Sequence, residues 1–406
     1  MFQSKSRTSL TNKKTLLFGL ISVFLCGMGF SIIMPVVPFL VTPYVTNASD
    51  QALMVTLLTS VYAFCVFFAA PGLGALSDRF GRRPVLLICF IGSAIGYFIF
   101  GLGGALWVLF LGRIIEGITG GSISTLFAFF ADMTPQEERT KYFGWVSAAA
   151  GAGAALGPAF GGLLAHFGYA MPFFFGTTIT FINFLFGYFY MPESLDDANR
   201  LKRIPLMRLN PFSQLLNILT IKNLGRLLIA AFFIWVPNGS LQAVMSQFAI
   251  DSFSWKPALI GMMFSIMGIQ DILSQAFVMP KLLIRLTDKQ IAVLGMIAEI
   301  IGYSLIATSS IFTLAPLLVI GMFVFGFGDS IFGPSFNGMV SKAASASEQG
   351  RIQGGSQAIQ SLARIIGPII GGQIYITLGH AAPAIMGVLL ITVAIFILYK
   401  KTSLAK

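Results

Sequence analysis

The sequence predicts an all-α membrane protein whose twelve transmembrane helices form two pseudo-symmetric six-helix bundles. The 406 residues are 56% hydrophobic and only 10% charged, whereas a soluble domain carries about 25% charged residues. The apolar residues gather in stretches of about 20 residues, the length that crosses a bilayer. Several motifs of the first half also return in the second half at one fixed spacing.

Twelve apolar stretches can be placed along the chain. The first follows Lys13 and Lys14 as in a signal peptide, but it is too long for an apolar signal region, so we expect it to be retained as helix 1. A polar stretch separates six spans from six, which predicts an N-terminal bundle (1–191), a cytoplasmic central linker (192–222) and a C-terminal bundle (223–406). The predicted spans are residues 16–40, 52–74, 85–104, 107–130, 142–164, 171–191, 224–249, 257–279, 290–309, 313–338, 352–377 and 380–399.

Lys and Arg predict the orientation, because short cytoplasmic loops carry an excess of both. With the N-terminus inside, all but three of the 26 Lys and Arg residues lie on the cytoplasmic side or in the termini. We therefore expect a multi-pass protein of the cell (inner or plasma) membrane with both termini in the cytoplasm. The net charge of +11 comes from these loops and not from one polar face, so no nucleic-acid partner is expected.

The two halves share motifs at an offset of 210 residues. Gly157-Pro158 returns as Gly367-Pro368, and Asp78 and Gly144 return as Asp288 and Gly354. Each pair falls in the corresponding helix or loop of its half. The constant offset predicts two bundles of one fold, related by an axis along the membrane normal.

The segment between the second and third spans carries the strongest local motif. It combines small residues for a tight turn with one acid and several bases that can hold neighbouring helix ends. An ordinary positively charged loop would explain the bases, but not the spacing of the glycines and the acid, so we predict a cytoplasmic gating loop. Its residues are Gly74, Asp78, Arg79, Gly81, Arg82 and Arg83.

The fifth span carries Gly153, Gly157 and Gly161 at four-residue spacing, so they share one helix face. Small residues allow two helix backbones to approach closely, and Pro158 removes one helix hydrogen bond. The pattern fits a hinge or seal between the halves, and it also fits ordinary tight packing.

Charged residues within spans point to a functional site, because each costs about 2.5–3.5 kcal/mol at a helix centre. Arg113 and Glu116 are three residues apart and neighbours on one face. They form either a structural ion pair or a proton site tuned by its partner. The residues concerned are Arg113, Glu116, Asp271, Glu299, Asp329 and Arg364.

The gating loop resembles the signature loop of the major facilitator superfamily. Three further stretches resemble its drug/proton antiporter branch, and the nearest likeness, over almost the whole chain, is to the tetracycline/proton antiporters. These stretches are Ile32-Ile-Met-Pro35-Val-Val-Pro38, Leu111-Gly-Arg113-Ile-Ile-Glu116-Gly-Ile-Thr-Gly120 and Gly153 to Gly162.

The resemblance implies the major facilitator fold and assigns roles to several residues. The loop would latch the two halves on the cytoplasmic side, with Asp132 pairing with a loop arginine such as Arg79. The glycines of the fifth span would form an antiporter signature, and Arg113 would take part in proton coupling. Gln275 matches a residue shared with the tetracycline antiporters.

The chain also departs from those antiporters. Cys26 and Gly96 stand where they carry acids in helices 1 and 3, and Asp271 stands where they carry a histidine. Glu299 matches their helix-9 acid, whereas Glu116 replaces a small residue. We expect Glu116, Asp271 and Asp329 to supply replacement carboxylates, which questions tetracycline recognition more than proton coupling.

These observations predict a proton-coupled secondary transporter that exports small organic or amphipathic compounds such as drugs. The alternatives are a proton symporter importing a nutrient or siderophore and, more remotely, a transporter-like sensor or receptor. An enzyme is not expected, because no nucleophile–base set, metal set or phosphate-binding loop is found. The expected partners are a small-molecule substrate, protons and the lipid bilayer, with no cofactor or metal and a monomeric state.

Overall fold

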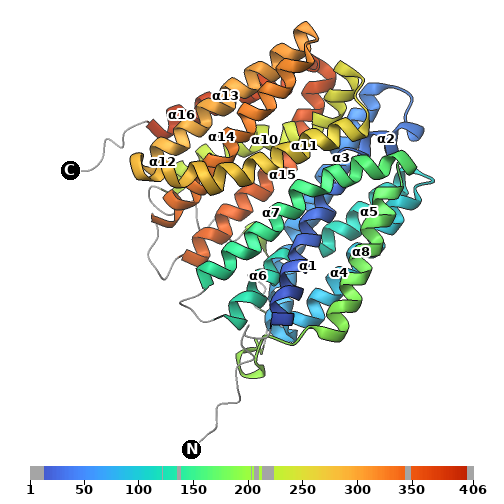
Figure 1. The fold of residues 1–406 in the computed structure, drawn as a ribbon, viewed down its shortest axis with the longest axis vertical. Coiled ribbons are helices and arrows are strands. Elements are labelled where there is room, and N and C mark those ends of the chain that lie inside the picture. The colour runs from blue at the N-terminus through green and yellow to red at the C-terminus, as the bar shows by residue number, and fades with distance from the viewer. Residues whose placement is uncertain are drawn as a thin grey trace, which may run out of the picture. The chain divides into compact units, whose positions relative to one another are not determined.

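The computed structural model describes residues 13–120, 122–134, 139–202, 204, 210–212, 224–342 and 349–399. These residues form helices and no strand (Figure 1). The predicted central linker lies in part outside the described residues, at 203, 205–209 and 213–222. The longer helices are α1 (Lys13–Ile32), α3 (Ala48–Phe80), α4 (Arg82–Leu102), α5 (Leu106–Thr119), α6 (Ser122–Met133), α7 (Arg139–Leu164), α8 (Met171–Tyr190), α10 (Leu224–Phe253), α11 (Pro257–Leu273), α13 (Asp288–Phe312), α14 (Ala315–Lys342), α15 (Gln349–Leu378) and α16 (Ala382–Tyr399).

The chain divides into two compact units. The first unit comprises residues 1–40, 61–210 and 257–268, and the second comprises 41–60, 211–256 and 269–406. Each unit therefore includes one short segment from the other half of the sequence. The start of α3 packs in the second unit, where Thr56 lies against Gly372, and the start of α11 packs in the first, where Pro257 lies against Gly162.

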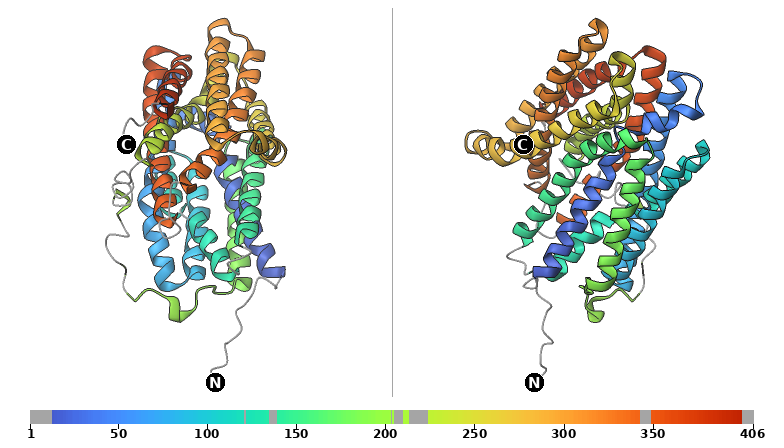
Figure 2. Two further views of the ribbon diagram at one scale, coloured as in Figure 1. Left: turned by 90° about the vertical axis from the view of Figure 1, so that its left-hand side faces the viewer. Right: turned by 45° about the vertical axis from the view of Figure 1, so that its right-hand side comes forward.

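The same packing pattern recurs in each unit. In the first, α1 packs against α7 and α8, and α4 packs against α5 and α8. In the second, α10 packs against α15 and α16, and α13 packs against α14 and α16; α13 and α14 run side by side in Figures 1 and 2. The rings of Tyr97 and Tyr303 even occupy matching places, against Gly176 of α8 and Gly387 of α16. The repeat found in the sequence is thus a repeat of structure.

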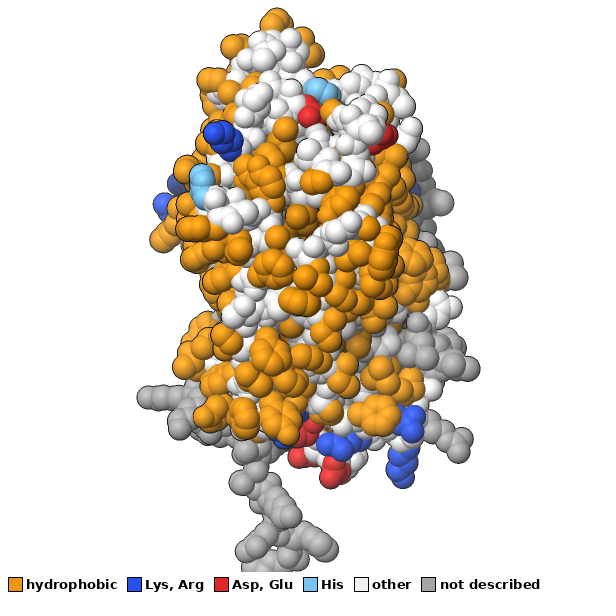
Figure 3. All heavy atoms as spheres, turned by 90° about the vertical axis from the view of Figure 1, so that its right-hand side faces the viewer, with side chains coloured by type: hydrophobic (Ala, Val, Ile, Leu, Met, Phe, Trp, Pro, Cys, Tyr) orange, Lys and Arg blue, Asp and Glu red, His pale blue; other side chains and the backbone are white. Residues whose placement is uncertain are grey.

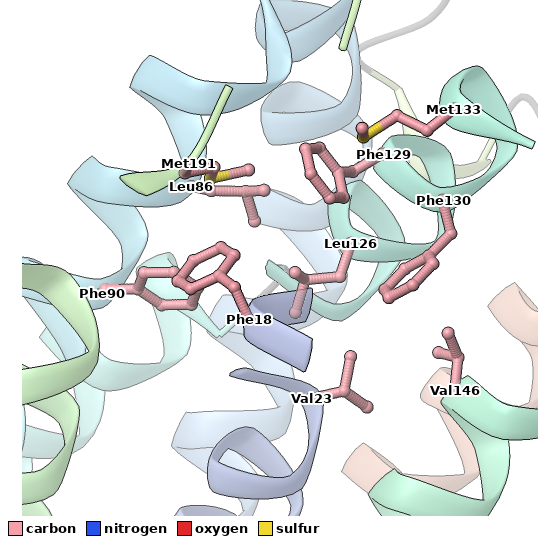
Figure 4. Close-up of a cluster of buried hydrophobic side chains, with 10 residues drawn as sticks. All are labelled: Phe18, Val23, Leu86, Phe90, Leu126, Phe129, Phe130, Met133, Val146 and Met191. Atoms are coloured by element: carbon pink, nitrogen blue, oxygen red, sulfur yellow. The ribbon is translucent and has the colours of Figure 1, made fainter. Parts of the chain in front are cut away.

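An apolar cluster holds the first unit together at one end of its helices. Side chains from α1, α4, α6 and α7 meet there with Met191, which directly follows α8 (Figure 4). Phe18, Phe129 and Phe130 are fully buried in it. In a membrane, such close packing contributes van der Waals contacts between the helices.

Many apolar side chains nevertheless remain exposed on the helices. In Figure 3 they cover most of the described surface on that face. Trp107, Phe189 and Phe396 are examples. Such a surface is unfavourable in water and suits a lipid environment.

Ten helices within the described residues are long and apolar enough to cross a membrane, and Ala382–Leu398 in α16 is a shorter apolar helix. The remaining predicted span, 107–130, is not one helix. Among the described residues, α5 ends at Thr119 with Gly120 as its cap, and α6 begins at Ser122. Glycine has a low helix propensity, which favours the end of α5 at Gly120.

Two other predicted spans are interrupted. The span 16–40 ends its first helix at Ile32 and resumes as α2 (Val37–Val41), since Pro35 and Pro38 cannot donate helix hydrogen bonds. The span 257–279 continues past α11 as a π-helical turn, η6 (Ser274–Val278), and then as α12 (Met279–Arg285). Single π-helical turns within α-helices frequently mark functional positions.

Candidate functional site

Arg82 is the centre of the gating loop. It is the first residue of α4, and its guanidinium donates to Ser77 Oγ at 2.7 Å and to Asp78 Oδ1 at 2.5 Å, both in the last turn of α3. It also donates to Asp132 Oδ2, near the end of α6, at 2.9 Å. One buried arginine thereby joins three helix ends through charge-assisted hydrogen bonds.

Asp132 does pair with an arginine of the gating loop, but this arginine is Arg82 and not the expected Arg79. Arg79 is exposed and its guanidinium lies over the Phe80 ring, 5.1 Å from the centroid. The two arginines lie on either side of Gly81, where α3 ends and α4 begins, and this turn directs only Arg82 inward. Arg83 donates to the Tyr188 carbonyl oxygen at 2.6 Å.

Glu193 caps α4, a role that the sequence alone did not suggest. Its carboxylate accepts from the backbone N–H groups of Arg82 at 2.8 Å and Arg83 at 3.2 Å, which are free donors at the start of a helix. Gly81 makes this approach possible, because it has φ +102° and a Cβ there would collide with Glu193 Oε2. The sequence signal that could have indicated this cap was the position of an acid, Glu193, just after an apolar span. A Cβ at Gly74, by contrast, would have no neighbour within 4 Å, so its packing does not require glycine.

The glycines of α7 lie against α1. A Cβ at Gly153 would meet the Phe24 carbonyl oxygen, one at Gly157 would meet Ser31 Oγ, and one at Gly161 would meet the Ile32 carbonyl oxygen. The predicted common face therefore exists, and it serves close backbone packing within the first unit. Pro158 contacts a different helix, because its carbonyl oxygen lies against Gly261 of α11.

Arg113 and Glu116 form an ion pair in α5. Arg113 Nη1 donates to Glu116 Oε2 at 2.8 Å, and both side chains are buried, with relative exposures of 6% and 5%. Tyr97 of α4 lies close enough to Glu116 to interact with it, and the Arg113 guanidinium lies over the rings of Tyr62 and Phe100. Each charge thus has a close, favourable partner.

Gly96 and Gly112 bring α4 and α5 into contact beside this pair. A Cβ at Gly96 would lie 3.0 Å from the Glu116 nitrogen and 3.1 Å from Glu116 Cβ. Gly96, one of the two positions where the resemblance implied an acid, therefore lies against Glu116. Cys26, at the other such position, lies 3.9 Å from Ser122 Oγ.

The second unit gathers carboxylates instead of an ion pair. Asn238 of α10 donates to Asp329 Oδ1 of α14 at 3.0 Å and accepts from the Tyr303 hydroxyl of α13 at 2.8 Å. Glu299, one turn before Tyr303, is fully buried. Asn238 lies close enough to interact with it, but neither Glu299 oxygen has a partner with hydrogen-bond geometry among the described residues. Sequence analysis missed Asn238 and Tyr303, although a polar residue within a span was the available signal.

Asp271 and Arg364 belong to the same neighbourhood. Both interact electrostatically with Asp329. Gln275, in the first half of the π-helical turn, donates to Asp271 Oδ1 at 2.8 Å. Four of the predicted cavity residues, Asp271, Glu299, Asp329 and Arg364, thus gather in the second unit, whereas Arg113 and Glu116 lie in the first.

A further polar cluster, which the sequence analysis did not single out, lies at the end of α10. Asp251 accepts from the Tyr375 hydroxyl at 2.7 Å and from Gln247 at 2.8 Å, and Gln247 also donates to Gln51 at the start of α3. These bonds fix the exchanged segment of α3 in the second unit. No group of three or more His, Cys, Asp or Glu suited to a metal ion occurs in the part of the chain that the structure describes.

Comparison with known proteins connects these features to a family. The family model of the Major Facilitator Superfamily matches residues 19–236 and 227–405. The chain is 35% identical to the tetracycline resistance protein of class C from Escherichia coli, over 87% of this chain and 88% of that one. It is 28% identical to multidrug resistance protein 2 of Bacillus subtilis, over 91% of each. A solved D-xylose–proton symporter has a similar fold, with a TM-score of 0.75 at 18% identity over 96% of this chain and 97% of that one.

Proposed function

The chain belongs to the major facilitator superfamily, and from this premise we propose that it is a proton-coupled exporter of small organic compounds, drugs among them. It lies in the cell (inner) membrane with both termini in the cytoplasm and works as a monomer. The relatives named for tetracycline and multidrug resistance support export over import. Proteins of this superfamily are transporters, so the chain is not an enzyme.

The observation that carries proton coupling is Glu299. This carboxyl group is fully buried in an apolar helix, without a hydrogen-bond partner among the described residues, and next to a second carboxyl group at Asp329. Intramembrane acids in such positions are typical of proton pathways in transporters. A change of protonation at Glu299 changes the cost of burying it, and so favours one conformation over another.

The proton gradient is a sufficient energy source. One proton moving down 100 mV supplies about 2.3 kcal/mol. At about 1.4 kcal/mol per decade, this supports a concentration ratio of roughly 50. No cofactor or nucleotide is needed.

The gating loop supplies the second requirement, a conformational latch. Arg82 joins the ends of α3, α4 and α6 and Glu193 caps α4, so we propose that this network holds the cytoplasmic helix ends in one state of the cycle. The glycines of α7 allow α1 and α7 to remain in contact as the helices move.

Purified protein in liposomes with an imposed pH gradient tests the proposal. Tetracycline and ethidium serve as probes, one for each named class of relative. An antiporter accumulates a probe inside liposomes whose interior is acidic, because outgoing protons drive entry. Accumulation only with an acidic exterior would show a symporter, and equal distribution of both probes under either gradient would contradict drug export of these classes.

A further inference from the structure

We infer that Asn238 is a positioning residue for proton coupling: oriented by Tyr303, its amide holds Asp329 as the charged, more accessible carboxylate and leaves Glu299 to carry the proton. This inference deepens the proposed function and rests on it. It assigns different tasks to two acids that the sequence leaves equivalent. It also gives roles to two neutral residues, Asn238 and Tyr303.

The Tyr303 hydroxyl fixes the orientation of the amide. Tyr303 is fully buried and its hydroxyl donates to Asn238 Oδ1 at 2.8 Å. The opposite end of the amide, the NH₂ group, therefore points to the carboxylates and donates to Asp329 Oδ1 at 3.0 Å. An amide turned the other way would place its oxygen against a carboxylate oxygen, two acceptors without a proton between them.

Accessibility separates the two acids. Asp329 is exposed, Asn238 is half-buried, and Glu299 is fully buried. Asp329 lies in an apolar span, where lipid cannot solvate a carboxylate, so an exposed acid at this position needs contact with water or a polar partner. Asp329 is the more accessible of the two acids, and Glu299 is the enclosed one.

The two acids are nonetheless adjacent. Gly328 precedes Asp329, and a Cβ at this glycine would lie 2.8 Å from the Glu299 nitrogen and 2.9 Å from Glu299 Cγ. The backbones of α13 and α14 therefore touch at this level. A proton or charge on one carboxyl group acts directly on the other.

The surrounding groups favour charge on Asp329 over Glu299. Asp329 faces Arg364 of α15 and the Asn238 amide of α10, together with Asp271 of α11. Glu299 faces Asp329, Tyr303 and Asn238, and α16 contributes no titratable side chain between Ala382 and Leu398. A single proton shared by the pair consequently resides on Glu299, since Asp329 has Arg364 and a hydrogen bond of good geometry from Asn238, whereas no cation in the described part of the chain faces Glu299.

Infrared difference spectroscopy can follow this proton without a transported compound. The full-length protein in liposomes is titrated with acid while the carbonyl stretch of protonated carboxyl groups is recorded. Variants Glu299→Gln and Asp329→Asn assign the two bands. We expect the Glu299 band to persist to higher pH than the Asp329 band in the wild type.

Asn238→Leu removes the donor and Tyr303→Phe removes only the hydroxyl that orients it. Each is expected to move the midpoint of the Asp329 band upward by about one pH unit, as the loss of one hydrogen bond to a charged group predicts. Because Tyr303 acts through Asn238, the double variant should shift no further than Asn238→Leu alone. Ser304→Ala, which removes a hydroxyl from the next, exposed position of α13, is the control and should leave the midpoint in place.

An unchanged Asp329 midpoint in Tyr303→Phe, the milder variant, would overturn the inference even if Asn238→Leu fails to fold. Additive shifts in the double variant would also overturn it, because Tyr303 would then act independently. Probe transport is measured separately. A shifted band in a protein that accumulates no probe would contradict the proposed function and leave the positioning role standing.

Discussion

The two units share one packing pattern but differ in how their buried charged residues are paired. In the first unit Arg113 and Glu116 form a buried ion pair at 2.8 Å. In the second unit Glu299 and Asp329 lie near each other, and Glu299 has no geometric hydrogen bond among the described residues. The two units therefore share a packing pattern, but the first contains a buried ion pair and the second contains a buried acid without a counter-ion in the part of the chain that the structure describes.

This difference separates a stabilising role from a functional one. Removing one member of a buried ion pair leaves an unpaired charge, which is costly. Glu299 has no counter-ion and no partner with hydrogen-bond geometry among the described residues, so neutralising it breaks no favourable ion pair. We therefore propose that the first unit's pair is structural and that the second unit's acids couple transport to protons.

The largest expected effect is on Glu116. The change Glu116→Gln leaves the Arg113 guanidinium buried without its counter-ion, and we expect the folded protein to lose about 3 kcal/mol of stability. Thermal unfolding of the purified protein measures this loss. The double variant Arg113→Met/Glu116→Leu should recover most of it, since no charge is left unpaired; a double variant as unstable as the single one would contradict a structural pair.

Arg82 should come next. The change Arg82→Gln breaks its contacts with Asp78 and Asp132, at a cost of about 2 kcal/mol, and should abolish probe accumulation in liposomes. Asp78→Asn should likewise abolish transport while the protein is still produced. Arg79→Gln is the matched control, because Arg79 is exposed, and it should transport normally; equal loss in both arginine variants would reduce the network to a charged surface.

Gly157 offers a test of packing in the first unit. A Cβ there would meet Ser31 Oγ and lie 2.7 Å from the Met28 carbonyl oxygen, whereas one at Gly151 in the same helix would have nothing within 4 Å. Gly157→Ala should lower stability by about 1–2 kcal/mol and slow transport. Gly151→Ala should be neutral or slightly stabilising, and similar behaviour of the two variants would show that close contact of α1 and α7 is not required.

How far the sequence predicts this molecule depends on the range of each interaction. Hydrophobic stretches and the offset of 210 residues are local or periodic signals, and they predict the helices and the repeat. Lipid chemistry explains why buried acids stand out among apolar residues. The sequence could not choose between Arg79 and Arg82 as the partner of Asp132, because the turn at Gly81 decides which side chain points inward.

Other features depend on contacts between distant segments. Asn238 acquires its importance only when α10, α13 and α14 bring it between Tyr303 and Asp329. The exchange of residues 41–60 and 257–268 between the units likewise follows from contacts such as Thr56 with Gly372, which periodicity cannot reveal. The role of Glu193 as a helix cap becomes visible only with the backbone geometry at Gly81.

Glu299 should show the smallest effect on stability. The change Glu299→Gln nearly preserves the shape of a fully buried side chain and removes its ability to take up and release a proton. We expect the melting temperature to stay within a few degrees of the wild type or to rise. A large loss of stability would indicate that Glu299 has a structural partner after all.

Transport by Glu299→Gln in liposomes tests the central claim most directly. One experiment measures exchange of a probe at equal pH on both sides, and a parallel one measures accumulation driven by an acidic interior. The account predicts that the variant still exchanges the probe but no longer accumulates it. Accumulation at the wild-type level in Glu299→Gln would contradict the assignment of proton coupling to this acid.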